Sequence, residues 1–332
     1  MSRTEINIGA PLDDQFGRHP RQTLPDALQG RLFAPGAGVF AVIDAARIEG
    51  FDAELIAQHQ PHACLFGGEA VETLGASAPW LIQLDPDARL TRLLFTHGRG
   101  GAGYWGRDWG ILIRSGAGFD ALRAHLRRFT QIADAGGKRY FLRFYCPHAA
   151  PALLDRLEGD PARQRRWFVH RDTRVIDSIW IPDAGRARVI VHDYDDPGTD
   201  GHPQPRFMLD DFYHAALQEG RLIRMRERIS RAVLVSEGNA AGRSTQDWHA
   251  NVNAGLDAAL RAGTEPERAL AYVALAGLRR GTPLSAAEVA HALGLPGASP
   301  GEQTQRARHL AEAAQARPII TDDIHSDIWT DR

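Results

Sequence analysis

A polar segment in the second half of the chain, DYDDPGTDGHPQP at residues 193–205, separates two regions whose apolar residues follow different patterns. It holds four aspartates, three prolines and two glycines, a composition typical of a linker between domains. Before it, short apolar runs of strand length alternate with segments of helical periodicity, whereas after it only helical periodicity is found. The sequence therefore predicts an α/β or α+β lobe with a mixed sheet and flanking helices, followed by an all-α lobe.

Continuous apolar runs mark the expected strands of the first lobe, which we place at residues 37–195 after an irregular lead-in at residues 1–36. VFAVIDAA, residues 39–46, is ended by Asp44 and has the unbroken apolar character of a strand buried on both faces. Further strands are expected at PWLIQL (79–84), GILIRSG (110–116), KRYFLRFYC (138–146), RVIDSIWI (174–181) and RARVIVHD (186–193). The helical second lobe is expected at residues 206–332, with a short acidic C-terminal tail.

The small net charge of the chain limits the kinds of partner that it is expected to bind. The chain has 39 lysines and arginines against 41 aspartates and glutamates, so its net charge of -2 gives no global attraction to nucleic acid or anionic lipid. No run approaches the roughly 18 apolar residues of a membrane-spanning helix, and the polar start of the chain lacks the apolar core of a signal peptide. We therefore expect a cytoplasmic protein with neither a nucleic-acid partner nor a membrane partner.

None of the segments with reactive residues predicts a catalytic, cofactor or metal site. The glycine-rich HGRGGAG, residues 97–103, fits neither the Walker pattern nor GxGxxG and is expected to be a mobile surface loop. Cys146 and His148 are separated by Pro147, which splays their side chains, so a buried thiol is expected rather than a nucleophile with its base. The histidines show no HExxH pattern for zinc. We expect no enzyme; the alternative is a small-molecule transferase or hydrolase with a helical cap.

The clearest local pattern is an amphipathic helix, GFDALRAHLRRF, at residues 118–129. Arg123, Arg127 and Arg128 lie on the face opposite its apolar residues. These arginines form either a solvated face, with ion pairs to neighbouring loops, or a docking surface for an acidic segment of a partner, because guanidinium groups match carboxylates. The apolar residues that recur at helical spacing are Phe119, Leu122, Leu126 and Phe129.

Six segments follow one another in order between Val39 and Phe168. They are VFAVIDAA, LFGGEA from Leu65, PWLIQL, SGAGFDALRAHLRRF from Ser115, LRFYCPH from Leu142 and RQRRWF from Arg163. This order resembles one family, the type VI secretion effector adaptor-chaperones, also called Tap or TEC proteins. The most specific part of this resemblance is the motif HLRRF, which is followed, across a Gly-Gly turn, by the motif RFY-x-P. The sequence departs from the family at Cys146 and His148, where Asp and Arg are common.

The resemblance implies an adaptor-chaperone that binds a toxic effector protein and helps load it onto the spike of a type VI secretion machine. Its partners would be the effector and the spike protein, and neither catalysis nor a cofactor would be involved. Six residues of the helix and of the arginine-aromatic strand are candidates for partner binding: Arg123, His125, Arg127, Arg128, Arg143 and Tyr145.

Overall fold

The computed structural model of the chain divides into two compact units, residues 1–221 and 222–332. The structure describes residues 1–13, 15–57, 59–97, 103–196, 206–237 and 245–314. The boundary between the units falls within helix α7 (Asp211–Glu237). Most of the predicted linker, residues 197–205, and the predicted acidic tail lie outside the described residues.

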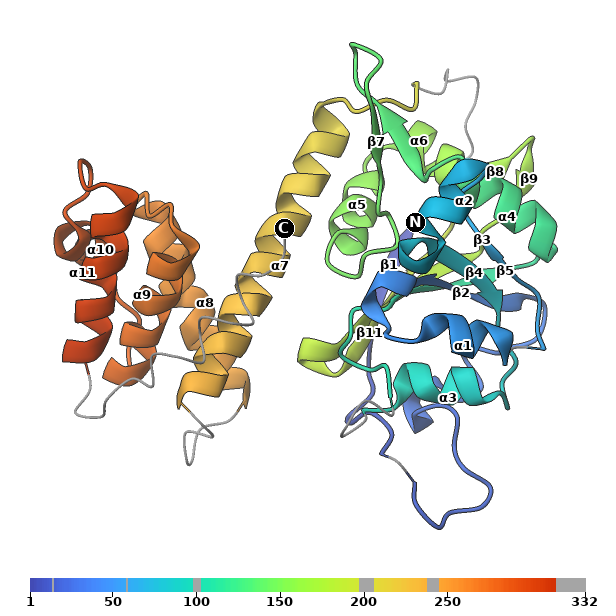
Figure 1. Ribbon diagram of the computed structural model, residues 1–332, viewed down its shortest axis with the longest axis horizontal. Helices are drawn as coiled ribbons and strands as arrows, with labels where there is room; N and C mark the ends of the chain where they lie inside the picture. Colours follow the sequence, from blue (N-terminus) through green and yellow to red (C-terminus); the bar gives the residue numbers. More distant parts are fainter. Residues whose placement is uncertain (14, 58, 98–102, 197–205, 238–244, 315–332) are drawn as a thin grey trace. The chain divides into compact units, whose positions relative to one another are not determined.

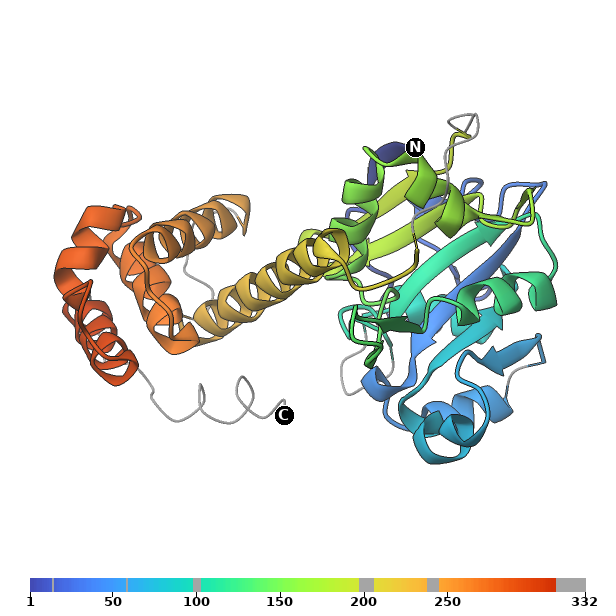
Figure 2. The ribbon, with the colours of Figure 1, turned by 90° about the horizontal axis from the view of Figure 1, so that it is seen from above.

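Seven strands form one sheet in the first unit, in the order β1-β11-β10-β5-β2-β4-β3. The strands are β1 (Ser2–Asn7), β2 (Gly38–Asp44), β3 (His62–Cys64), β4 (Pro79–Gln83), β5 (Gly110–Ser115), β10 (Ser178–Asp183) and β11 (Arg188–Asp193). Each neighbouring pair is antiparallel, and Figure 2 shows the strands running side by side. The predicted fold class is therefore confirmed, in its α+β form.

Both faces of this sheet are buried, which explains the unbroken apolar runs. Phe40 and Val42 of β2 belong to one core, whereas Val39, Ala41 and Ile43 belong to the other. The first core lies under α4 (Phe119–Arg127), α5 (Ala150–Leu157) and α6 (Pro161–Phe168), and the second under α1 (Phe51–Ile56) and α3 (Arg89–Phe95) (Figure 1). Because side chains alternate along a strand, a strand between two helical layers needs apolar residues at every position.

The strand at one edge of the sheet, β1, lies within residues 1–36, where an irregular lead-in was expected. All six of its residues pair with β11. Only Ile6 of the six is buried. Backbone pairing along an exposed, charged edge stabilises this strand. Its sequence therefore lacks the apolar alternation from which a strand is usually predicted.

The predicted strand at residues 138–146 is shorter in the structure. Only Arg139–Phe141 is extended, as β7, and it pairs with β6 (Gln131–Ala133) to form a small hairpin beside the sheet. The alternation expected for a longer strand fails because two consecutive side chains, Phe144 and Tyr145, are both buried. The other short elements of this unit are α2 (Glu69–Leu74), β8 (Val169–His170) and β9 (Thr173–Arg174).

The second unit is all-helical, as predicted. It contains the larger part of α7 with α8 (Thr245–Arg261), α9 (Glu267–Arg280), α10 (Ala286–Leu293) and α11 (Pro300–Ala313), and it has its own apolar core. Arg279, only 2% exposed, pairs with Glu237 at 2.6 Å and thereby ties the end of α7 to α9. Ser285 and Ser299 begin α10 and α11 with capping boxes. No described helix is both long enough and apolar enough to cross a membrane.

Two histidines of the first unit are buried in the neutral form. His125 is fully buried, and its Nε2 donates to the carbonyl of Trp167 at 2.7 Å. His192 in β11 is 1% exposed. Burial, together with the positive charge of nearby arginines, lowers the pKa of each side chain from 6.5 to about 4. Between pH 6.5 and pH 4 the unfolded chain therefore binds more protons than the folded one, so stability falls as the pH falls through this window.

We expect the free energy of unfolding of the first unit to fall as the pH is lowered from about 6.5 to about 4, with each histidine contributing on the order of 3 kcal/mol. Replacing His192 with Gln removes one of these groups and should flatten the curve over this range. Urea unfolding followed by tryptophan fluorescence measures the effect, because five of the seven tryptophans lie in this unit. Parallel curves for the two proteins would contradict the account.

Candidate partner-binding surface

Helix α4 brings together segments that are far apart in the sequence. The guanidinium of Arg127 lies directly against Gly67, in the segment that follows β3. Arg123 on the preceding turn donates from Nη2 to the carbonyl of Cys64 at 3.4 Å. On its buried side, His125 contacts the backbone of Trp167. Three of the six quoted segments, LFGGEA, HLRRF and RQRRWF, therefore meet at this helix.

The two glycines of the Leu-Phe-Gly-Gly-Glu segment have different structural roles. Gly68 adopts φ 60° and ψ -146°, a backbone conformation that is open only to glycine. At Gly67 a side chain would collide with the Arg127 guanidinium, so the absence of a Cβ admits the arginine. The chain therefore turns at Gly68, and the Arg127 guanidinium packs against Gly67.

A second contact joins the end of β2 to the segment after β7. The carboxylate of Asp44, only 3% exposed, forms an ion pair with Arg143, whose side chain is 44% exposed. Tyr145 is buried beside them, and burial together with the Asp44 charge raises the pKa of its hydroxyl. The aspartate that ends VFAVIDAA and the arginine of LRFYCPH are therefore partners.

The segment around Cys146 and His148 departs from the expectations. Cys146 is half-buried rather than buried, because the chain turns there instead of continuing as a strand. His148 pairs through Nε2 with Asp108 at 3.0 Å. Asp108 belongs to residues 104–110, which follow the predicted mobile loop, and the aromatic side chains there are buried in the second core: Tyr104, Trp105 and Trp109. These residues are therefore fixed by packing, whereas residues 98–102 of the predicted loop lie outside the described residues.

The structure separates the six predicted binding residues into two groups. His125 and Tyr145 are 0% and 2% exposed, so neither side chain is available at the surface. The reason for His125 is that it lies beside the apolar stripe of α4 and packs edge-on against Phe129. The surface candidates that remain are the half-buried Arg123 and the exposed Arg127, Arg128 and Arg143.

The three arginines predicted to share one face, Arg123 and Arg127 in α4 and Arg128 directly after it, do not form one cluster. Arg123 and Arg127 contact the segment after β3, whereas Arg128 donates from Nη1 to Nδ1 of His170, in the β8–β9 hairpin, at 2.5 Å. Helical spacing explains the difference, because positions four apart share a side of the helix and the next residue is rotated away from it. Arg123 and Arg127 therefore act together at one border of the helix.

An aromatic pair, formed by the half-buried Phe66 and the exposed Phe141, was not predicted from the sequence. The rings of Phe66 and Phe141 lie 4.8 Å apart at 33°, and Phe141 is 51% exposed. Phe66 adjoins the Gly67 contact, and Phe141 ends β7. The one signal in the sequence was the pair of adjacent aromatic residues, Tyr140 and Phe141, next to a tight turn.

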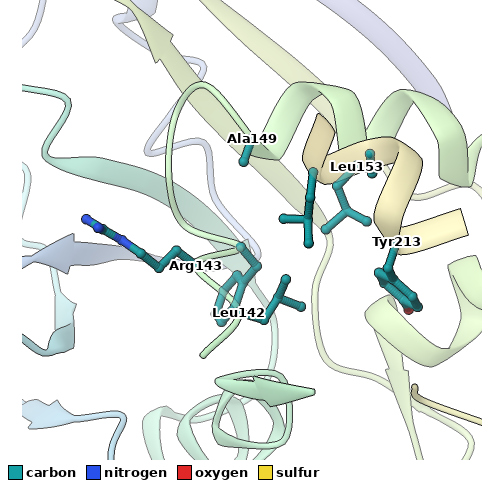
Figure 3. Close-up of a pocket in the computed structure, with 8 residues that line it drawn as sticks. Leu142, Arg143, Ala149, Leu153 and Tyr213 are labelled. Carbon is teal, nitrogen blue, oxygen red and sulfur yellow. The ribbon is translucent and has the colours of Figure 1, made fainter. Parts of the chain in front are cut away.

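The described cavity near this surface is not a ligand site. It has a volume of about 10 Å³, room for about one water molecule, and its walls are mainly apolar. Figure 3 shows the Arg143 side chain pointing away from the cavity, which lies between the turn after β7 and helices α5 and α7. Within the described residues, no group of three or more His, Cys, Asp or Glu side chains is arranged to hold a metal ion.

Comparison with protein families gives a match within the first unit. Residues 39–164 match a family model described as a domain of unknown function, DUF4123. The matched region runs from β2 into α6 and contains every contact described above between Asp44, Gly67, α4 and Arg143. No curated protein and no solved structure matches the chain.

Replacing Arg143 with Leu should lower the free energy of unfolding by about 2 to 3 kcal/mol, because it leaves the buried Asp44 carboxylate without its partner. Urea unfolding measured by tryptophan fluorescence gives this value. The matched control is Arg139→Leu, at an exposed arginine close by in sequence, which should change stability by less than about 0.5 kcal/mol. Equal effects of the two substitutions would show that the Asp44–Arg143 pair does not stabilise the unit.

Proposed function

We propose that this protein is a cytoplasmic adaptor-chaperone that binds a toxic effector protein and helps to load it onto the spike of a type VI secretion machine. Two findings support the proposal: the order of six sequence segments resembles that family, and residues 39–164 match the DUF4123 model. The observation that carries it is that two of these segments, LFGGEA and HLRRF, meet at one surface, where Arg127 lies against Gly67. Phe66 of LFGGEA also contacts Phe141, the residue that precedes LRFYCPH.

The polar contacts at this surface are those expected of a scaffold. The Asp44–Arg143 pair and the Arg123 contact with the Cys64 carbonyl hold chain segments in place. Arg127 is exposed and forms no ion pair with any carboxylate that the structure describes. A guanidinium in that state is suited to a partner's carboxylate, and arginine is enriched at protein interfaces.

In this proposal the protein has no catalytic step, and its partners are the effector and the spike protein rather than nucleic acid or a membrane. The cavity of Figure 3 does not favour a small-molecule transferase or hydrolase, because it has no convergent set of polar groups. The arrangement of genes is the first check of the proposal. Adjacent genes for a toxin and a spike protein are expected, and an operon of metabolic enzymes would contradict it.

Replacing both Arg123 and Arg127 with Glu should weaken the complex with the effector by about 2 kcal/mol or more, because reversed charges would face the partner's carboxylates. Co-purification with the product of the adjacent toxin gene, followed by a measured Kd, tests this.

The control for that variant is Arg21→Glu with Arg31→Glu, an equal change of charge at two exposed arginines outside residues 39–164. Melting curves of both free variants establish that each is folded. If the two double variants bind the effector equally well, the border of α4 that carries Arg123 and Arg127 is a solvated face.

A further inference from the structure

The aromatic pair, with Phe66 half-buried and Phe141 exposed, lies between two arginines. Phe66 precedes Gly67, against which the Arg127 guanidinium lies. Phe141 is two residues from Arg139 on β7, and side chains two apart on a strand lie on the same face. The pair therefore has one arginine from α4 beside Phe66 and one from the hairpin beside Phe141.

Both arginines are free of internal ion pairs. Arg127 and Arg139 are exposed, and neither pairs with a carboxylate in the part of the chain that the structure covers. The carboxylate of Asp134, on the hairpin, accepts hydrogen bonds from the Tyr140 hydroxyl at 3.0 Å and the Lys138 amide at 2.9 Å. Glu69 and Glu72 of α2 are exposed but pair with neither arginine.

Elsewhere in the same unit, arginines are used to neutralise local acids. Arg163 pairs with Asp160 and Asp210, and Arg188 pairs with Glu5 and Asp183. Arg127 and Arg139 thus form no ion pair among the described residues, and their guanidinium groups are available to the carboxylates of an acidic partner.

From this arrangement we infer that the surface formed by Phe66, Phe141, Arg127 and Arg139 is the anchor site for a client segment in which apolar side chains alternate with carboxylates. The apolar side chains cover the two rings, and the carboxylates pair with the two guanidiniums. Aromatic residues and arginine dominate the binding energy of protein interfaces, and two rings contributed by distant segments form a preformed platform. This inference rests on the proposed function, in which the client is the effector.

The test uses the full-length protein and the purified product of the adjacent toxin gene. Phe141→Ser should raise the Kd about 30-fold, because burying that ring supplies much of the binding energy. Arg139→Gln should raise it about fivefold and should reduce the dependence of the Kd on salt concentration, because one screened charge pair is lost. Both side chains are exposed, so the melting temperature should stay close to that of the wild type.

The matched control is Phe16→Ser, the same chemical change at a phenylalanine that is 96% exposed and lies outside residues 39–164. It should leave the Kd unchanged. A wild-type complex that Phe141→Ser and Arg139→Gln leave intact overturns the anchor site and leaves the proposed function standing. A wild-type protein that binds neither effector nor spike protein overturns the proposed function and the anchor site with it.

Discussion

The buried carboxylate of Asp44 is the constraint on which the described surface depends. It ends β2, the strand whose residues belong to both apolar cores, and its backbone amide is fixed by the carbonyl of Trp109 at 2.7 Å. A carboxylate that has left water is stable only if it is paired, and its partner here is Arg143. This pair holds the chain after β7 against the end of β2. The hairpin that carries Phe141 is thereby anchored to the sheet.

Helix α4 positions the arginines of the surface. Its apolar stripe is buried against the sheet, so the borders of the helix face the neighbouring segments. Arg127 lies against Gly67 on one border, and Arg128 reaches His170 on the other. The position of each arginine along the helix therefore determines which neighbouring segment it contacts. Only the border with Arg127 adjoins the aromatic pair, and so only that border joins positive charge to exposed apolar surface.

The sequence predicted the fold class well because both lobes have strong periodic patterns. The run at residues 39–46 is a strand between two cores, and the stripe at residues 118–129 is the buried face of a helix. It could not predict β1, whose stability comes from backbone pairing rather than from apolar side chains. It predicted too long a strand at residues 138–146, because Phe144 and Tyr145 pack into the core on consecutive positions.

The surface, too, depends on contacts that no periodic pattern in the sequence reveals. Arginines on the polar face of a helix are visible in a sequence, but the carboxylates they pair with depend on tertiary contacts. The Phe66–Phe141 pair joins the segment after β3 to β7, and no local pattern in the sequence encodes this tertiary contact. His125 looked available because it stands between arginines, whereas its position next to the apolar stripe places it in the core.

Hydrogen–deuterium exchange with and without the effector would show whether the assembled segments bind a partner. We expect slower exchange on binding in peptides covering residues 62–70, 119–129 and 138–146, together with little change in β1. Protection confined to residues 222–332, with these three segments unchanged, would contradict this expectation.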